Sequence, residues 1–331
     1  MRALVLSSGL GLLAGCFDVG GDLDLDLGGD SCFLPAPCVS TRHPFRFLDE
    51  TPANVALGGE AEVAYLALDT LMGFDIASLD PGVVTVERRG RDFVMHAVGA
   101  GSTVIEARAA DGSMLETRGV SVGRVASVGF AFTPAGEQPL AKLAALPGAR
   151  ERIRVLPRDA GGSILGGAEA VVALGFTGGV ARIDLNAAQL RPGVFELFSA
   201  PVAAGYDVGV EFGALGGGTI AASVGGAAVG SLPLEVVAAA KDVALRVNGR
   251  AETKSVLVVG LVGSDANGVP VAGLVGDFAA TPAELVAIVS PEDRGEVLVG
   301  TLATPGVVTI SATLADRVVS TVIAISERPT W

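Results

Sequence analysis

The chain has 331 residues, of which 50% are hydrophobic and 18% are charged, and its formal net charge is −13 at pH 7. This length suits two or three packed domains, and its 46 glycines follow no regular period, which excludes a collagen-like fibre. An acidic surface repels phosphate backbones, so we expect no nucleic-acid partner.

The first sixteen residues have the pattern of an export signal. Arg2 precedes the apolar run 3–13, which is too short to span a bilayer, and the small residues Ala14 and Gly15 precede Cys16. This pattern resembles a bacterial lipoprotein signal, in which the cysteine is acylated and the chain is cut before it. The resemblance implies a signal peptide over residues 1–15 and a mature protein whose lipid, a palmitate-type acyl chain, is carried on Cys16. Phe17, rather than Asp, follows the cysteine, which favours the outer membrane of the cell envelope.

Residues 16–40 are acidic and rich in glycine. Asp22, Asp24 and Asp26 alternate with leucines, and we expect a flexible tether here. A calcium site is the alternative, although no EF-hand spacing is present. Cys32 and Cys38 predict a small disulfide loop, because exported chains meet an oxidising compartment. A metal site would need further ligands, so no metal is expected.

From Phe45 onward, alternating apolar residues predict short strands joined by turns. The clearest strand alternates Thr103, Ile105 and Ala107 on one face with Glu106 and Arg108 on the other. We expect strands over residues 62–68, 83–86, 103–108 and 114–122, with a hairpin turn at 110–113. The apolar stretch 220–240 contains glycines and a proline, so strand, turn, strand is expected there rather than a membrane helix.

One strand pattern occurs three times. Gly101-Ser-Thr-Val-Ile-Glu-Ala superposes on Gly306-Val-Val-Thr-Ile-Ser-Ala and, less closely, on Gly216-Gly-Gly-Thr-Ile-Ala-Ala. Each leading glycine is expected to turn the chain with a positive φ, and each isoleucine to face a core. The turn Asp159-Ala-Gly-Gly corresponds to Asp265-Ala-Asn-Gly. These repeats predict three sandwich units, over residues 41–123, 124–238 and 239–331.

The first unit resembles a known family. Val83-Val-Thr-Val, the repeated strand from Gly101 and the turn Asp111-Gly112 together resemble bacterial Ig-like domains of group 2, the BIG2 family. The match covers mainly this unit and the end of the third, and the second departs from it around residues 139–148. The resemblance implies an all-β fold of tandem Ig-like β-sandwich domains acting as a stalk, adhesion or binding module at the cell surface. The family pattern contains no catalytic residues and no cofactor, so we expect no enzyme activity.

Few residues suggest chemistry. The two histidines, His43 and His96, lie far from any nucleophile motif, and His96 falls within an expected strand. A hydrolase using loop carboxylates such as Asp69, Asp75 and Asp80 is one alternative function. The other is a lipid-anchored accessory subunit of an envelope complex.

One basic strand differs from the acidic background. Arg150, Arg152 and Arg154 alternate and therefore share a strand face. They predict either a solvated edge strand protected from aggregation by its charges, or a contact surface for an acidic envelope or surface protein or a polysaccharide.

Overall fold

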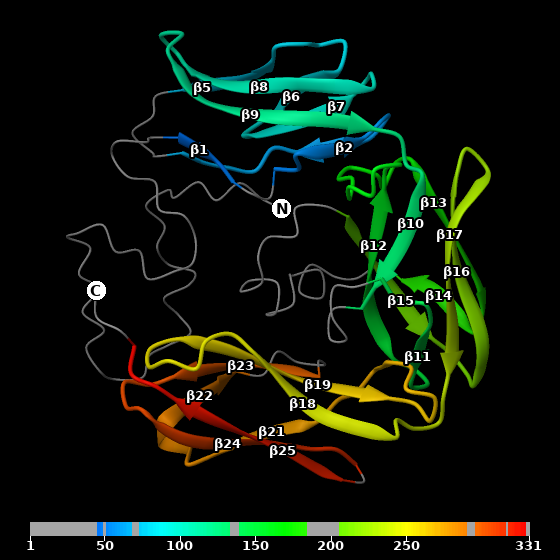
Figure 1. The fold of residues 1–331 in the computed structure, drawn as a ribbon, viewed down its shortest axis with the longest axis vertical. Coiled ribbons are helices and arrows are strands. Elements are labelled where there is room, and N and C mark those ends of the chain that lie inside the picture. The colour runs from blue at the N-terminus through cyan, green and yellow to red at the C-terminus, as the bar shows by residue number, and fades with distance from the viewer. Residues whose placement is uncertain are drawn as a thin grey trace. The chain divides into compact units, whose positions relative to one another are not determined.

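The computed structural model describes residues 45–48, 51–67, 73–132, 139–183, 205–289, 295–315 and 317–328 (Figure 1). Regular structure there is β-strand, apart from the 3-10 turn η2 (Ala283–Leu285). None of the described residues forms a helix that is long and apolar enough to cross a membrane. The predicted class, an all-β fold of tandem Ig-like sandwiches, is confirmed. Cys16, Cys32, Cys38 and the tether lie outside the described residues.

The described residues form two compact units. One comprises the chain up to residue 126 together with 157–171 and 205, and the other comprises the remainder. The three-unit division drawn from the sequence repeats is not tested by this grouping and stays a prediction.

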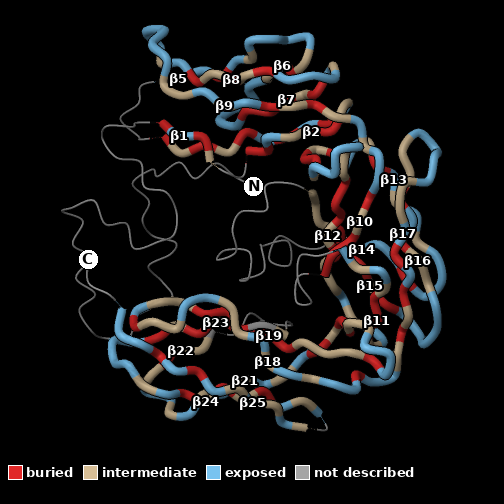
Figure 2. The backbone as a smooth tube through the Cα atoms, in the orientation of Figure 1, coloured by how far each residue is buried: buried red, intermediate tan, exposed pale blue. Residues whose placement is uncertain are grey.

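The first unit packs two main sheets and a small ribbon around one core. Buried residues, drawn in red in Figure 2, alternate with exposed ones along its strands. The core gathers aromatic and β-branched side chains, including Phe45, Phe93, Ile105 and Val120. In spatial order, the first sheet contains β2 (Asn54–Ala56), β9 (Met114–Gly123), β8 (Gly101–Ala109) and β5 (Phe74–Ser78). The second contains β3 (Glu60–Glu62), β7 (Asp92–Ala97) and β6 (Val84–Arg89). The ribbon pairs β1 (Phe45–Phe47) with β4 (Tyr65–Ala67).

The expected strand over residues 62–68 is wrong in its extent. The chain forms two strands there, β3 and β4, which belong to different sheets. Between them, the Val63 N–H donates to the Phe93 carbonyl, and the Ala64 carbonyl accepts from both the Leu48 N–H and the Thr51 hydroxyl. These bonds bend the chain from one sheet to the other, which an unbroken apolar alternation does not reveal.

Two further sheets are built largely from residues 127–236. One contains β10 (Ser127–Ala131), β12 (Arg150–Arg158), β15 (Tyr206–Phe212) and β14 (Val180–Ile183) in spatial order. The other contains β13 (Val172–Gly178), β16 (Gly216–Val224), β17 (Ala227–Val236), β11 (Leu143–Ala145) and β20 (Val271–Ala272). Ile153, Phe212, Ile220 and Leu232 are fully buried. The strands β16 and β17 confirm the strand, turn, strand prediction for residues 220–240.

The last part of the chain forms a sandwich of its own. One sheet is β18 (Asp242–Asn248), β19 (Val256–Ser264), β23 (Glu296–Thr301) and β22 (Val286–Val289), and the other is β21 (Asp277–Thr281), β24 (Gly306–Thr313) and β25 (Val318–Ile325). Leu257, Val299, Ile310 and Ile323 lie in the core between them.

The three repeated glycines each begin a strand, β8, β16 and β24. Gly101 and Gly216 have φ of 147° and 139°, as predicted. Gly306 does not have a positive φ, so the conformational reason predicted for it is wrong. A Cβ at Gly306 would lie 2.7 Å from Leu285 Cδ1, the end of a flexible side chain that can move aside, so the structure does not require a glycine there. The repeated isoleucines Ile105, Ile220 and Ile310 are all fully buried, as expected.

Candidate functional site: two strand-paired junctions

In the first compact unit, residues 157–171 begin with a closed turn. The Ser163 N–H donates to Asp159 Oδ1 over 2.9 Å, the Gly162 N–H donates to the Asp159 carbonyl, and the Asp159 N–H donates to the Ser163 carbonyl. The Arg158 guanidinium also donates to the Gly162 carbonyl over 2.7 Å. The aspartate thus fixes the loop before the chain reaches the sheet.

After this turn the chain pairs with the short strand β2. The Gly166 N–H donates to the Asn54 carbonyl over 2.9 Å, and the Ala56 N–H donates to the Gly166 carbonyl over 3.0 Å. One residue further, the Glu60 N–H donates to the Gly167 carbonyl. On its other side β2 runs parallel to β9. Strand β2 is therefore covered along both edges.

The second compact unit repeats this arrangement. The Val269 N–H donates to Asp265 Oδ1 over 2.9 Å, the Gly268 N–H donates to the Asp265 carbonyl, and the Asp265 N–H donates to the Val269 carbonyl. A second N–H, that of Asn267, donates to Asp265 Oδ1 over 2.7 Å. The Val269 N–H is the main cause of the lowered pKa of Asp265, because it stabilises the charged carboxylate.

Strand β20 follows the Asp265 turn and pairs in parallel with β11. The Ala144 N–H donates to the Pro270 carbonyl, and the Leu146 N–H donates to the Ala272 carbonyl. The other edge of β11 runs parallel to β17. One five-stranded sheet therefore contains strands from residues 143–236 and from the segment that follows β19.

A shared sequence pattern produces both junctions. Each has the form Asp-Ala-x-Gly-x-x-x-x-Gly, from Asp159 to Gly167 and from Asp265 to Gly273. The last glycine has φ of 66° in the first and 85° in the second. A Cβ would lie 2.3 Å from the Glu60 carbonyl oxygen at Gly167, and 2.5 Å from Ala149 Cβ at Gly273. The glycine is therefore required both by its conformation and by close approach.

Side chains reinforce the second junction. Ala144 lies in one buried cluster with Ala240, Leu261, Val271 and Leu274. The Gly273 N–H also donates to Glu151 Oε1 over 2.8 Å. Backbone pairing, apolar burial and this charge-assisted bond all stabilise the contact between β11 and β20.

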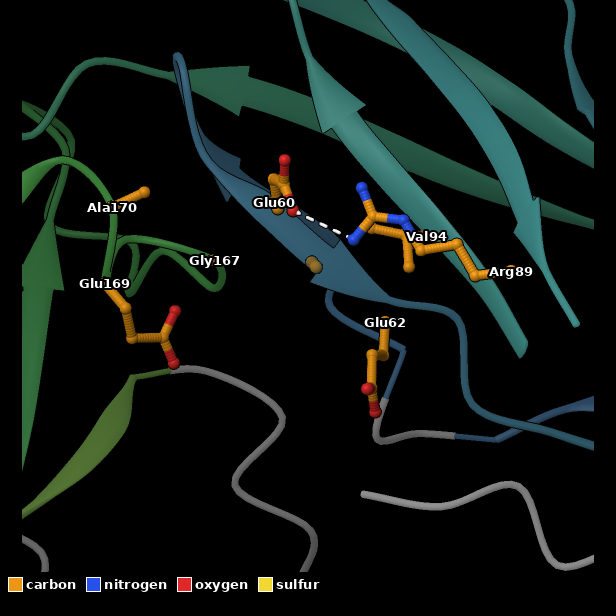
Figure 3. A pocket seen from close by; sticks show the side chains of 8 residues that line it. Glu60, Glu62, Arg89, Val94, Gly167, Glu169 and Ala170 are labelled. Atoms are coloured by element: carbon orange, nitrogen blue, oxygen red, sulfur yellow. Dashed lines mark hydrogen bonds and ion pairs between the residues drawn. The ribbon is translucent and has the colours of Figure 1, made fainter. Parts of the chain in front are cut away.

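A shallow hollow of about 300 Å³ lies beside the first junction. It is lined by Glu60, Glu62, Glu169 and Arg89 together with smaller residues, and Figure 3 shows the three carboxylates pointing in different directions. Arg89 Nη1 pairs with Glu60 Oε2 over 3.4 Å. A general acid and base must converge on one reacting atom, and these groups do not.

His96 belongs to an ion-pair network on the same sheet. Its Nδ1 lies 3.1 Å from Glu60 Oε1, and its Nε2 lies 3.1 Å from Glu87 Oε2. The hydrogen bond from Arg89, and then that from His96, lowers the pKa of Glu87. Both nitrogens of His96 thus face carboxylates, and in the described part of the chain no group of three His, Cys, Asp or Glu could hold a metal ion.

The carboxylates considered for hydrolysis have local roles. Asp75 lies on β5 and accepts from the Ile76 N–H, whereas Asp80 follows that strand and accepts from the Gly82 N–H over 2.9 Å. They do not form one loop cluster. Asp69 lies outside the described residues.

The three arginines share a face of β12, but their surroundings differ. Arg152 and Arg154 have exposed side-chain fractions of 12% and 14% and pair with Asp207 over 3.4 and 3.5 Å. Arg150 is 60% exposed and pairs with Glu211 over 3.1 Å. Strand β12 lies between β10 and β15, so the expectation of an edge strand is wrong. A partner surface formed by these arginines stays a prediction.

Comparison with known proteins gives structural likeness only. No family model and no curated protein matches the chain. Among solved structures, domains 4–9 of the surface layer protein SbsC align at a TM-score of 0.37 and 14% identity, over 78% of this chain and 39% of that one. The Escherichia coli adhesin FdeC aligns at a TM-score of 0.27 and 13% identity, over 84% of this chain and 95% of that one. The bacterial integrin-binding protein invasin aligns at a TM-score of 0.25 and 16% identity, over 86% of this chain and 60% of that one. This chain therefore spans about two fifths of the SbsC fragment.

Sequence reasoning noticed the two aspartate turns as equivalent but missed the junctions that follow them. The signal was the second glycine, which lies eight residues after each aspartate. A glycine within an extended segment often marks a place where another part of the backbone approaches closely.

Proposed function

We propose that this chain is a non-catalytic lipoprotein of the cell envelope that serves as a stiff stalk, anchored through the lipid on Cys16. The resemblance to the BIG2 family, the outer-membrane location and an envelope or surface partner belong to this proposal. The observation that carries it is the second junction, where one sheet continues from β17 through β11 into β20. Domains within one chain usually move relative to each other unless a large apolar interface holds them.

A stalk requires neighbouring strands to keep a fixed spacing and to resist separation. Strand pairing fixes the spacing between β11 and β20, and the buried cluster around Ala144 opposes their separation. Glu60 is used in an ion pair, and Asp159 and Asp265 are used in turns. These observations favour the stalk over the hydrolase.

The stalk is tested by distance measurement across the second junction. Spin labels on cysteines placed at the exposed positions Ala173 and Thr281, with the native cysteines replaced by serine, report the distance distribution by pulsed electron paramagnetic resonance. A single narrow distribution is expected, and a broad one would overturn the stalk. In cells, the Cys16→Ser chain is expected in the soluble fraction, and its retention by membranes would contradict the anchor.

A further inference from the structure

Strand β25 is an unusually bare edge. In the described part of the chain β24 is the one strand that forms a hydrogen-bonded ladder with β25, and β18 of the facing sheet also lies close to it. It has the sequence Val-Val-Ser-Thr-Val-Ile-Ala-Ile, with no charge, glycine or proline. Val318 and Val322 are 64% and 67% exposed. Long apolar edge strands of this kind attract further strands, and most proteins protect them.

The direction of the backbone groups follows from the end of the strand. The Ser326 N–H donates to the Ala251 carbonyl, and the Ser326 carbonyl accepts from the Thr253 N–H, both on the side away from β24. Because the strand alternates, the N–H and C=O groups of residues 318, 320, 322 and 324 face the same way. Among the described residues, no main-chain bond is formed on that side by these four.

The corresponding strands β9 and β17 carry protection at the same position. Register with the preceding strand pairs Val104 with Gly119, Thr219 with Pro233 and Thr309 with Val322. A glycine or a proline weakens further pairing, whereas a valine favours it. Strand β9 also carries Glu116 and Arg118, while β25 is uncharged throughout.

The position used by the two junctions is closed here. Glu252 forms a parallel bridge with Ser326 at the end of β25, as Asn54 does with Ser121 and Ala144 with Glu235, although Ser326 lies two residues further along its strand. Its carbonyl accepts from the hydroxyls of Thr301 and Ser255.

The next outward N–H, that of Lys254, donates to the Leu302 carbonyl, and Lys254 has a φ of 54°. The last sandwich therefore differs from the others in two ways. The outward backbone groups of residues 252–254 are bonded within the same sandwich, and no strand pairs with the outer edge of β25 in the described part of the chain.

We infer that β25 is a self-association edge that pairs antiparallel with β25 of a second copy of this chain. In this pairing Val318 of one copy faces Ala324 of the other, and Ser320 faces Val322. Each of the four outward residues therefore faces another outward residue, and every outward N–H and C=O gains a partner. The segment at Glu252 stops the pairing beyond residue 324 in both copies.

The charge at β25 itself is compatible with a second copy as the occupant. The net charge of −13 makes two copies repel at long range, whereas the uncharged strand β25 adds no repulsion at the place where they would meet. Arg317 precedes the strand and Glu327 follows it. The Arg317 guanidinium donates to the Ala240 and Lys241 carbonyls of its own chain, so the proposed pairing does not depend on it.

The test uses the full chain with Cys16→Ser, so that acyl chains do not drive association. Sedimentation velocity over a range of protein concentrations measures the monomer–dimer equilibrium. Val322→Pro introduces the residue that β17 carries at this position. It removes an N–H that points away from β24, so the ladder within the sheet is kept. Val322→Lys provides a second edge variant with an unaltered backbone.

The matched control is Val307→Lys on the inner strand β24, where the exposed valine lies on the same sheet face opposite Ala324. We expect a dimer for the parent chain and for Val307→Lys, and dimerisation about tenfold weaker or more for both edge variants, since each copy loses a pairing contact. Circular dichroism confirms that the variants are folded. A parent chain that stays monomeric, or equal weakening by Val307→Lys, would overturn edge pairing.

Discussion

The two junctions begin with a turn closed by the same three hydrogen bonds but differ in what surrounds the final glycine. Gly167 faces the Glu60 carbonyl of the backbone, whereas Gly273 faces the methyl group of Ala149. Around Gly167 the pairing with β2 is a single bridge at Gly166, while β20 pairs over two residues and lies within an apolar cluster. The same sequence pattern therefore produces one junction held mainly by main-chain geometry and another held also by side-chain packing.

The largest effect is expected at Gly167. Gly167→Ala would hold an alanine at a positive φ and bring its Cβ against the Glu60 carbonyl of β3. We therefore expect a loss of about 2–4 kcal/mol in the free energy of unfolding. The matched control is Gly162→Ala, which has a positive φ but nothing within 4 Å, and it should cost about 1 kcal/mol. Urea unfolding curves measure both. Equal losses would show that the close approach at Gly167 contributes nothing.

The strands with the clearest alternation were predictable from the sequence, because burial on one face imposes a period of two. The strand from Gly101 and its copies have their isoleucines in cores, and the hairpin at Asp111 closes through the Ser113 N–H as expected. The break at Val63 was not predictable, because it depends on hydrogen bonds to Phe93 and Leu48, which are distant in sequence. Local patterns carry no information about such partners.

The site was harder to predict than the fold. Arg150, Arg152 and Arg154 were correctly placed on one face, but their partners Asp207 and Glu211 lie on β15, more than fifty residues later. Pairing across strands depends on register, and an interior strand cannot be told from an edge strand by its own charges.

An intermediate effect is expected at the aspartate turns. Asp265 accepts from two main-chain N–H groups and is buried, whereas Asp159 Oδ1 accepts from the Ser163 N–H and is less buried. Asp265→Ala should lower the melting temperature of the second unit by about 2–4 °C, and Asp159→Ala should lower that of the first by less. Differential scanning calorimetry checks the order. The reverse order would mean that the additional bond from Asn267 does not stabilise the turn.

The same aspartate predicts an acid dependence. The folded pKa of Asp265 is lowered chiefly by the Val269 N–H, so its contribution to stability is complete above the unfolded value of about 4. It is lost as the pH falls from that value through the folded pKa. The difference in melting temperature between the parent chain and Asp265→Asn should therefore shrink below about pH 4. A constant difference down to pH 2 would contradict this.

The smallest effect is expected at Arg150, and it separates structure from recognition. Its ion pair with Glu211 joins two exposed side chains on neighbouring strands, and water screens such pairs, so Arg150→Ala should cost about 0.5 kcal/mol or less. A double-mutant cycle with Glu211→Gln measures the coupling directly. A coupling above about 1 kcal/mol would show that Arg150 holds the sheet together. A small coupling leaves this cation with no structural need, and Arg150 would then be the position on β12 at which an acidic partner could be recognised.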